Sequence, residues 1–283
     1  MNTHNISLVS LHSQRPFMAD ARYKSDGNPK PVVIFNHGFK GFKDWGPFPL
    51  VADAFAQAGF VFIKVNFSHN GVTRKTQQNL LIWRLFPKTI SASNSMIRRF
   101  CLTRCSMTHR VLTKKDMDLS RLYIAGHSRG GASAILKAAE DSRIKKVATW
   151  AAVSNLETWH SKAELDYWRT NRLIYVLNKR TNQQMPLDFQ LVENYQENRS
   201  RLHVPDAVKK LQIPMLAIHG SADETVPVAA AHSFKEWNPS VKVKIIDNAN
   251  HTFGADHPFI GSKLPNDFQL VVDETVRFFC ESK

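Results

Sequence analysis

Short apolar runs alternate with stretches of helical periodicity along most of the chain. Six of these runs are mostly apolar and end at a glycine or a polar turn, which is typical of parallel strands buried beneath helices on both faces of a sheet. We expect the six strands at residues 31–37, 60–67, 122–125, 146–153, 214–219 and 241–246. Weaker alternation at 6–10 and 16–23 predicts an antiparallel pair ahead of them.

The spacing of apolar residues also predicts helices. Residues 47–58 carry apolar side chains at helical spacing and stop at Gly59, residues 131–140 form a helix of small residues, and residues 267–280 form an amphipathic closing helix. Strands that alternate with helices predict an α/β fold, in which a mostly parallel sheet is covered on both faces.

Residues 154–213 are too long for a simple connection between two strands. The stretch is aromatic and helical in pattern, so we interpret it as a crossover helix with a helical cap insertion over the site. Residues 1–153 and 214–283 would then form the core. The alternative is a set of extra helices packed on the scaffold.

Composition narrows the class of protein. With 283 residues, 43% of them hydrophobic, the chain can bury a substantial core. No apolar stretch is long enough for a transmembrane helix, and residues 1–14 lack the charged-then-apolar pattern of a signal peptide. The three cysteines do not form a disulfide framework. We therefore expect a cytoplasmic protein with no membrane partner.

The net charge of +14 comes from one segment. Between Ala54 and Lys115 there is no Asp or Glu, while eight Lys or Arg residues lie between Arg74 and Arg110. Such a segment can be a basic arm that binds nucleic acid or phospholipid, or a solvated surface insertion. A third interpretation of residues 74–110 is a compensated frameshift in the gene.

The frameshift hypothesis depends on reading this segment one nucleotide out of register. With permitted codons it then spells a string rich in acidic residues with helical periodicity, and the net charge of the chain falls to about −3, ordinary for a cytoplasmic protein. Because methionine has a single codon, Met96 before Ile97 and Met107 before Thr108 each force an aspartate in the shifted frame. On this hypothesis the charge says nothing about partners, and no nucleic-acid partner is expected.

A serine in a glycine-rich turn is the candidate nucleophile. Gly126-His-Ser-Arg-Gly130 matches G-x-S-x-G and lies between an apolar strand and a helix of small residues, the context that this motif requires. The glycines let strand and helix approach closely. The sharp turn exposes the hydroxyl of Ser128 above a helix N-terminus, which favours negative charge.

A serine hydroxyl needs a base, and the base needs an acid to orient it. In this architecture the order along the chain is serine, acid, histidine. Asp223 follows the strand at 214–219 and His251 follows the strand at 241–246. Because the carboxyl ends of parallel strands meet at one edge of a sheet, both loops should open beside Ser128.

Three neighbouring residues are rivals for the roles of acid and base. Glu224 is adjacent to the candidate acid. His127 precedes the nucleophile, and we expect it to point to another side of the turn. His219 is expected to be a packed residue at the end of its strand.

The negative charge that develops on a substrate carbonyl oxygen requires two preorganised N–H donors. One should be the backbone N–H of Arg129, immediately after the nucleophile. The other should come from Asn36-His-Gly-Phe-Lys-Gly41, the loop after the strand at 31–37, with Phe39 as donor. The alternative for this loop is a glycine turn alone.

Four motifs, HGFKG, GHSRGG, HGSADETVP and NHTFG, occur in this order. They resemble those of the α/β-hydrolase superfamily, and within it the dienelactone-hydrolase-like branch with its small feruloyl- and cinnamoyl-type esterases. The resemblance covers residues 31–72 and 116–279 and fails in between. It implies a cytoplasmic serine esterase without a cofactor, often with a helical insertion before the acid-bearing strand. A serine replaces the cysteine of true dienelactone hydrolases, so their substrate class is not implied.

The sequence thus predicts hydrolysis of a small-molecule carboxylic ester through an acyl-enzyme. Thioesterase, peptidase and acyltransferase reactions use the same residues, so the triad does not choose among them. The aromatic cap favours an apolar or aromatic group on the substrate. Two other classes are an inactive fold and a basic-arm protein that binds nucleic acid or membrane. The histidines are scattered rather than grouped at ligand spacings, so no metal site is proposed.

Overall fold

The computed structural model describes residues 1–9, 16–67, 115–157, 161–178 and 182–281. The segment 74–110, on which the basic-arm and frameshift hypotheses depend, lies outside the described residues.

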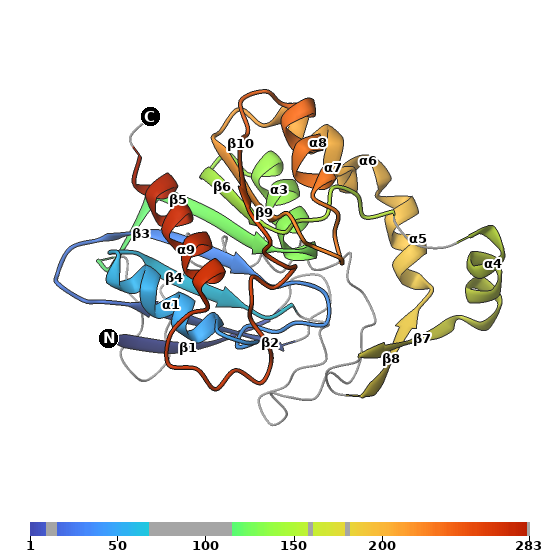
Figure 1. Ribbon diagram of the computed structural model, residues 1–283, viewed down its shortest axis with the longest axis horizontal. Helices are drawn as coiled ribbons and strands as arrows, with labels where there is room; N and C mark the ends of the chain where they lie inside the picture. The colour runs from blue at the N-terminus through green and yellow to red at the C-terminus, as the bar shows by residue number, and fades with distance from the viewer. Residues whose placement is uncertain (10–15, 68–114, 158–160, 179–181, 282–283) are drawn as a thin grey trace.

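Within the described residues, eight strands form one central sheet in the order β1-β2-β4-β3-β5-β6-β9-β10 (Figure 1). Strand β1 pairs antiparallel with β2, and β2 pairs antiparallel with β4. The remaining neighbours are parallel. The strands are β1 (Asn2–Val9), β2 (Pro16–Tyr23), β3 (Lys30–Asn36), β4 (Val61–Val65), β5 (Met117–His127), β6 (Ile144–Trp150), β9 (Met215–Gly220) and β10 (Lys242–Ile246). The predicted antiparallel pair and six parallel strands are all present.

Helices cover both faces of the sheet, and two apolar clusters fill the space beneath them. On β3, Val32 and Ile34 join the cluster under one set of helices, while Val33 and Phe35 join the cluster under the other. This alternation follows from the period of two along a strand. The first set is α3 (Arg129–Glu140), α7 (Val204–Lys210) and α8 (Ala229–Trp237); the second is α1 (Phe48–Gln57) and α9 (Asn266–Cys280). The α/β-hydrolase fold expected from the sequence is therefore confirmed.

The insertion between β6 and β9 departs from its sequence prediction. It contains α4 (Lys162–Asn171), α5 (Gln190–Glu197) and α6 (Arg199–Leu202), but also a hairpin of β7 (Leu173–Asn178) and β8 (Gln183–Asp188). Residues 173–188, which the sequence analysis assigned to a helical cap insertion, form this hairpin. There Ile174 and Val176 pack against the core cluster while Tyr175 is exposed, the alternation of a half-buried strand.

The hairpin and α4 lie at one end of the molecule (right in Figure 1). Ser161 and Glu164 form a capping box at the start of α4. The buried Trp168 joins α4 to the hairpin because its indole N–H donates to the Leu187 carbonyl oxygen at 3.0 Å. None of the described helices combines the length and apolarity needed to cross a membrane.

Candidate active site

Ser128 lies on a sharp turn between β5 and α3. Its φ of 55° and ψ of −122° are rare for a residue with a side chain, so the backbone there is strained. Hydrogen bonds hold this conformation on both sides. The Ser128 N–H donates to the Trp150 carbonyl at 2.8 Å, and the Ser128 carbonyl accepts from the Gly131 N–H at 2.9 Å. The neighbouring strand and helix therefore fix the serine in its strained position.

The glycines of the motif let backbone segments touch. A β-carbon on Gly126 would lie 2.2 Å from the carbonyl oxygen of Gly130, and one on Gly130 would lie 2.2 Å from the carbonyl oxygen of Asn36. No real β-carbon fits at such distances. The serine turn thus packs directly against the end of β3, where the candidate oxyanion loop begins.

Asp223 and His251 meet across two loops that leave the carboxyl ends of β9 and β10. The His251 Nδ1 donates to the Asp223 Oδ2 at 2.8 Å. The loops approach closely because Gly220 has no side chain: a β-carbon there would lie 2.1 Å from the carbonyl oxygen of Ala249. The Ala222 N–H also donates to that carbonyl, at 3.1 Å. Glu224, the rival acid, is exposed.

The Asp223 carboxylate is held by more donors than His251 alone. Its Oδ1 accepts the backbone N–H groups of Thr225 and Val226, each at 2.8 Å. The buried His219 Nε2 lies 3.2 Å from Oδ2 and 2.9 Å from the Val226 carbonyl oxygen. Burial opposes ionisation of Asp223, but hydrogen bonds from His219, His251 and Val226 outweigh it and hold the pKa of Asp223 below its usual value.

His219 is the neighbour that the sequence analysis treated only as a packed residue. It is packed, but its Nε2 also lies against the carboxylate oxygen that accepts from His251. The spacing of four residues between His219 and Asp223, across a turn after a strand, was the only sequence signal for this contact.

His127 links the serine turn to the candidate base. Its Nε2 donates to the backbone carbonyl oxygen of His251 at 2.9 Å, and the two imidazole rings lie 4.9 Å apart. His127 therefore supports the backbone that carries the base. The hydrogen bonds among the described residues do not include one between Ser128 Oγ and His251. Such contacts are often loose without substrate and shorten when substrate binds.

The two candidate oxyanion residues lie side by side. A β-carbon on Gly38 would be 3.1 Å from the Ser128 Cβ, so the loop carrying Phe39 passes close to the candidate nucleophile. The guanidinium of Arg129 lies 5.6 Å from the centre of the Phe39 ring. That guanidinium is buried, and desolvation lowers the pKa of Arg129 to about 9.

The insertion touches the same loop. The Lys40 Nζ, next to Phe39, donates to the Leu177 carbonyl oxygen on β7 at 3.0 Å. Along the ranges that the structure describes, no group of three or more His, Cys, Asp or Glu side chains is arranged to hold a metal ion.

Fold and site together define the class of protein: an α/β-hydrolase-fold enzyme, a serine hydrolase. More specifically, the chain belongs to the prolyl oligopeptidase family, whose model matches residues 105–260. A search of curated protein sequences finds no match.

Solved structures of hydrolases cover almost the whole chain. Est1E from Butyrivibrio proteoclasticus, with ferulic acid bound, is 19% identical with a TM-score of 0.69, over 96% of this chain and 97% of that one. An esterase domain from a Rhodothermus marinus protein is 16% identical with a TM-score of 0.64, over 98% of each chain. A dienelactone hydrolase from Anabaena variabilis is 15% identical with a TM-score of 0.60, over 98% and 96%. The expected resemblance to this branch is confirmed at the level of the fold.

Proposed function

We propose that the protein hydrolyses a small-molecule carboxylic ester through an acyl-enzyme on Ser128. His251 acts as general base and then general acid, and Asp223 orients it. The backbone N–H groups of Arg129 and Phe39 stabilise the oxyanion. The observation that carries the proposal is the 2.8 Å hydrogen bond between His251 and Asp223, at the sheet edge where the strained serine turn lies.

The reaction follows from these positions. The Ser128 Oγ attacks the carbonyl carbon while its proton passes to His251, and the carbonyl oxygen becomes an oxyanion. When the intermediate collapses, the bond to the leaving alkoxide breaks and His251 returns the proton to it. Water then attacks the acyl group by the same route and releases the acid. Asp223 stays ionised throughout and stabilises the imidazolium, a role that its lowered pKa supports.

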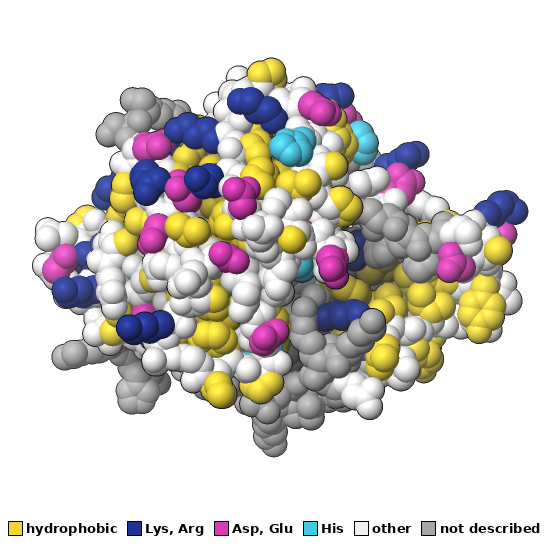
Figure 2. All heavy atoms as spheres, viewed as in Figure 1, with side chains coloured by type: hydrophobic (Ala, Val, Ile, Leu, Met, Phe, Trp, Pro, Cys, Tyr) yellow, Lys and Arg dark blue, Asp and Glu magenta, His cyan; other side chains and the backbone are white. Residues whose placement is uncertain are grey.

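An apolar or aromatic acyl or alcohol group fits the surroundings best. Hydrophobic side chains gather on the end of the molecule that carries the insertion (Figure 2). Tyr167 and Tyr175 are 64% and 63% exposed there, and Leu177 is 39% exposed on the strand bonded to the candidate oxyanion loop. Est1E, with ferulic acid bound, provides a precedent on the same fold for an aromatic ligand.

Cleavage of a peptide bond is the second candidate, because the family to which the chain belongs is that of prolyl oligopeptidase. The same serine, histidine and aspartate would carry it. Cleavage of an amide requires protonation of a poorer leaving group than cleavage of an ester does. Rates on matched substrates that differ only in the scissile bond therefore distinguish an esterase from a peptidase.

A fluorophosphonate probe tests the proposed nucleophile, since it labels an activated serine whatever the natural substrate. We expect labelling of the wild type, loss in Ser128→Ala and retention in Ser133→Ala. Ser133 is the matched control: it is buried in α3, and its Oγ has no hydrogen-bond partner among the described residues. A folded wild type that takes no label would refute the proposal.

Hydrolysis rates on different substrates then identify which kind of bond the enzyme cleaves. Aryl and short-chain esters, including methyl ferulate, are compared with anilides of the same acyl groups and with proline-containing peptides. We expect Ser128-dependent hydrolysis of the esters to exceed that of the anilides. The reverse order would replace the ester proposal with the peptidase.

A further inference from the structure

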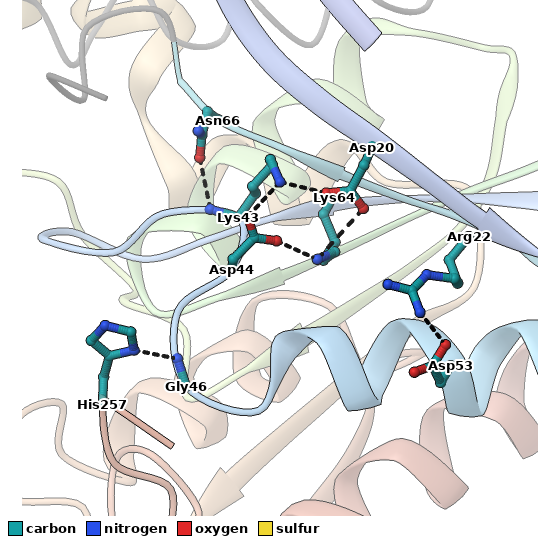
Figure 3. Close-up of polar contacts among 9 residues, drawn as sticks. All are labelled: Asp20, Arg22, Lys43, Asp44, Gly46, Asp53, Lys64, Asn66 and His257. Carbon is teal, nitrogen blue, oxygen red and sulfur yellow. Dashed lines mark hydrogen bonds and ion pairs between the residues drawn. The ribbon is translucent and has the colours of Figure 1, made fainter. Parts of the chain in front are cut away.

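Four charged side chains form a closed ring that joins the loop at residues 37–47 to strands β2 and β4 (Figure 3). The Lys43 ammonium pairs with Asp20 at 2.6 Å and with Asp44, and the Lys64 ammonium pairs with Asp44 at 2.6 Å and with Asp20 at 3.5 Å. Positive and negative groups alternate, so the ring is neutral. We call these four residues the charge ring.

The charge ring lies in the interior. Only 1% of the Lys64 side chain, 4% of Asp20 and 6% of Lys43 are exposed, against 28% of Asp44. Burial opposes the charged forms of Lys43 and Asp44, but their partners outweigh it: the pKa of Lys43 is raised and that of Asp44 is lowered. Both groups therefore remain charged at neutral pH.

Stability alone does not explain such a ring. Well-packed apolar residues in the place of a buried ion pair are often as stabilising, because desolvation offsets the attraction between the charges. What a ring supplies is geometry. Asp20 and Lys64 are register partners on β2 and β4, so they form a fixed base on the sheet. Lys43 and Asp44 belong to the loop and are held to that base.

Two further tethers fix the same stretch of loop. The Lys43 backbone N–H donates to the Asn66 Oδ1 at 2.7 Å, just beyond β4, and the Gly46 N–H donates to the His257 Nδ1 at 3.0 Å. Figure 3 shows these contacts on either side of the charge ring. The loop is thus fixed at residues 43, 44 and 46.

Hydrogen-bonded turns connect the fixed residues 43–46 to Gly38, which lies beside Ser128. The Trp45 N–H donates to the Phe42 carbonyl at 3.0 Å, and the Gly41 N–H donates to the Gly38 carbonyl at 3.1 Å, so successive tight turns join Asp44 to Phe39. Gly38 in turn packs on Ser128. A displacement at Lys43 or Asp44 would therefore move the Phe39 N–H, and a shift of about 1 Å in such a donor can cost 100-fold in rate.

We propose that the charge ring and Asn66 are positioning residues that aim the Phe39 N–H at the oxyanion. This inference depends on the proposed function, because it assigns these residues to the proposed oxyanion hole. Neither the charge ring nor Asn66 is proposed to contact the substrate.

The experiment compares Asp44→Asn and Asn66→Ala with Asp53→Asn. Asp44 is the most exposed member of the charge ring, and Asn66→Ala removes a tether without leaving a buried charge. Asp53 is the matched control, since its 2.5 Å pair with Arg22 joins α1 to β2 beside the charge ring without involving the loop. Each variant is assayed for ester hydrolysis, for inhibition by an aryl boronic acid, and for hydrogen exchange of the 37–47 peptide.

We expect Asp44→Asn and Asn66→Ala to lower kcat by about 10- to 100-fold with KM nearly unchanged, because the loop acts on the transition state. The inhibition constant of the boronic acid, which forms a tetrahedral adduct on Ser128, should rise by a similar factor. Exchange of the 37–47 peptide should accelerate in both variants. Asp53→Asn should change none of the three.

Equal effects of all three variants on kcat and on loop exchange would overturn the inference, and so would a fall in kcat without faster exchange. If the wild type hydrolyses no ester, the proposed function fails first. Loop exchange then decides the inference alone, and unchanged exchange in Asp44→Asn and Asn66→Ala refutes it.

Discussion

The free energy of unfolding should decrease as the pH falls below neutral, because buried His37 resists protonation in the folded protein. His37 follows β3, and its side chain is fully buried. Its ring lies 4.6 Å from that of Phe67, and its Nδ1 donates to the Gly38 carbonyl oxygen at 2.9 Å. Desolvation lowers the pKa of His37 to about 4, and the hydrogen bond to Gly38 and the charge of Asp44 offset it only in part.

The size of the effect follows from the difference between the folded and unfolded pKa values. An unfolded histidine titrates near 6.5, so the pKa is depressed by about 2.5 units on folding, which corresponds to about 3 kcal/mol. Between pH 6.5 and 4 the unfolded chain binds a proton that folded His37 does not. The free energy of unfolding therefore falls as the pH falls through this window and loses nothing more from His37 below it. A domain with a total stability of about 5–15 kcal/mol should show this clearly.

Urea denaturation at pH 7, 6, 5 and 4.5, followed by tryptophan fluorescence, measures the effect. His37→Asn removes the titratable ring and keeps an N–H near Gly38. It should be less stable than the wild type at pH 7, because it loses packing against Phe67, but the gap should close by about 3 kcal/mol towards pH 4. His232→Asn, at an exposed position, should run parallel to the wild type. A His37→Asn curve that is also parallel would refute the buried, uncharged state of His37.

Substitutions at Gly130 and His219 test the geometry of the site, with Gly27→Ala as the control for the first. Gly130→Ala would put a β-carbon 2.2 Å from the Asn36 carbonyl oxygen, so α3 must move by about 1 Å and kcat/KM for an ester should fall about 100-fold. Gly27→Ala, where the added carbon meets nothing within 4 Å but φ is +84°, should lower Tm and leave kcat/KM unchanged. His219→Leu removes a donor to Asp223 and should lower kcat about tenfold, or about 1.4 kcal/mol, while His219→Gln keeps an N–H and most of the rate. Equal kcat in the two His219 variants would show that the contact with Asp223 has no part in the reaction.

The sheet and the proposed nucleophile could be predicted because both depend on short-range patterns. A parallel strand covered on both faces must be mostly apolar along its length, which identified the inner strands of the sheet. The edge strand β10 alternates exposed lysines with less exposed apolar residues and was identified by its place in the alternation of strands and helices. Ser128 was identified by its glycines and by the strand and helix around it. Asp223 and His251 then followed from chain order, since only loops at the carboxyl ends of later strands can reach the serine.

The hairpin at 173–188 was missed because its strands are too short for their period to show. A run such as Leu173 to Leu177 is equally compatible with one face of a helix until its partner strand is known. The charge ring could not be predicted from the sequence for a different reason. Asp20 and Lys64 become neighbours only when β2 pairs with β4, and nothing local in either strand indicates the partner.

The two proposed oxyanion donors therefore differ in what fixes them. Arg129 follows Ser128 directly, and the glycines at 126 and 130 hold that turn by backbone contact alone. Phe39 depends on a loop whose tethers come from β2, from the end of β4 and from the segment before α9. A backbone contact is insensitive to most substitutions elsewhere, whereas loss of one member of the charge ring leaves its buried partners without their opposite charge. Substitutions far from Ser128 should therefore affect catalysis mainly through the position of Phe39. Distant substitutions that lower activity should therefore concentrate in β2, at the end of β4 and in the loop around His257. Strand β10, at the far end of the sheet, should tolerate change except in the loop that carries His251.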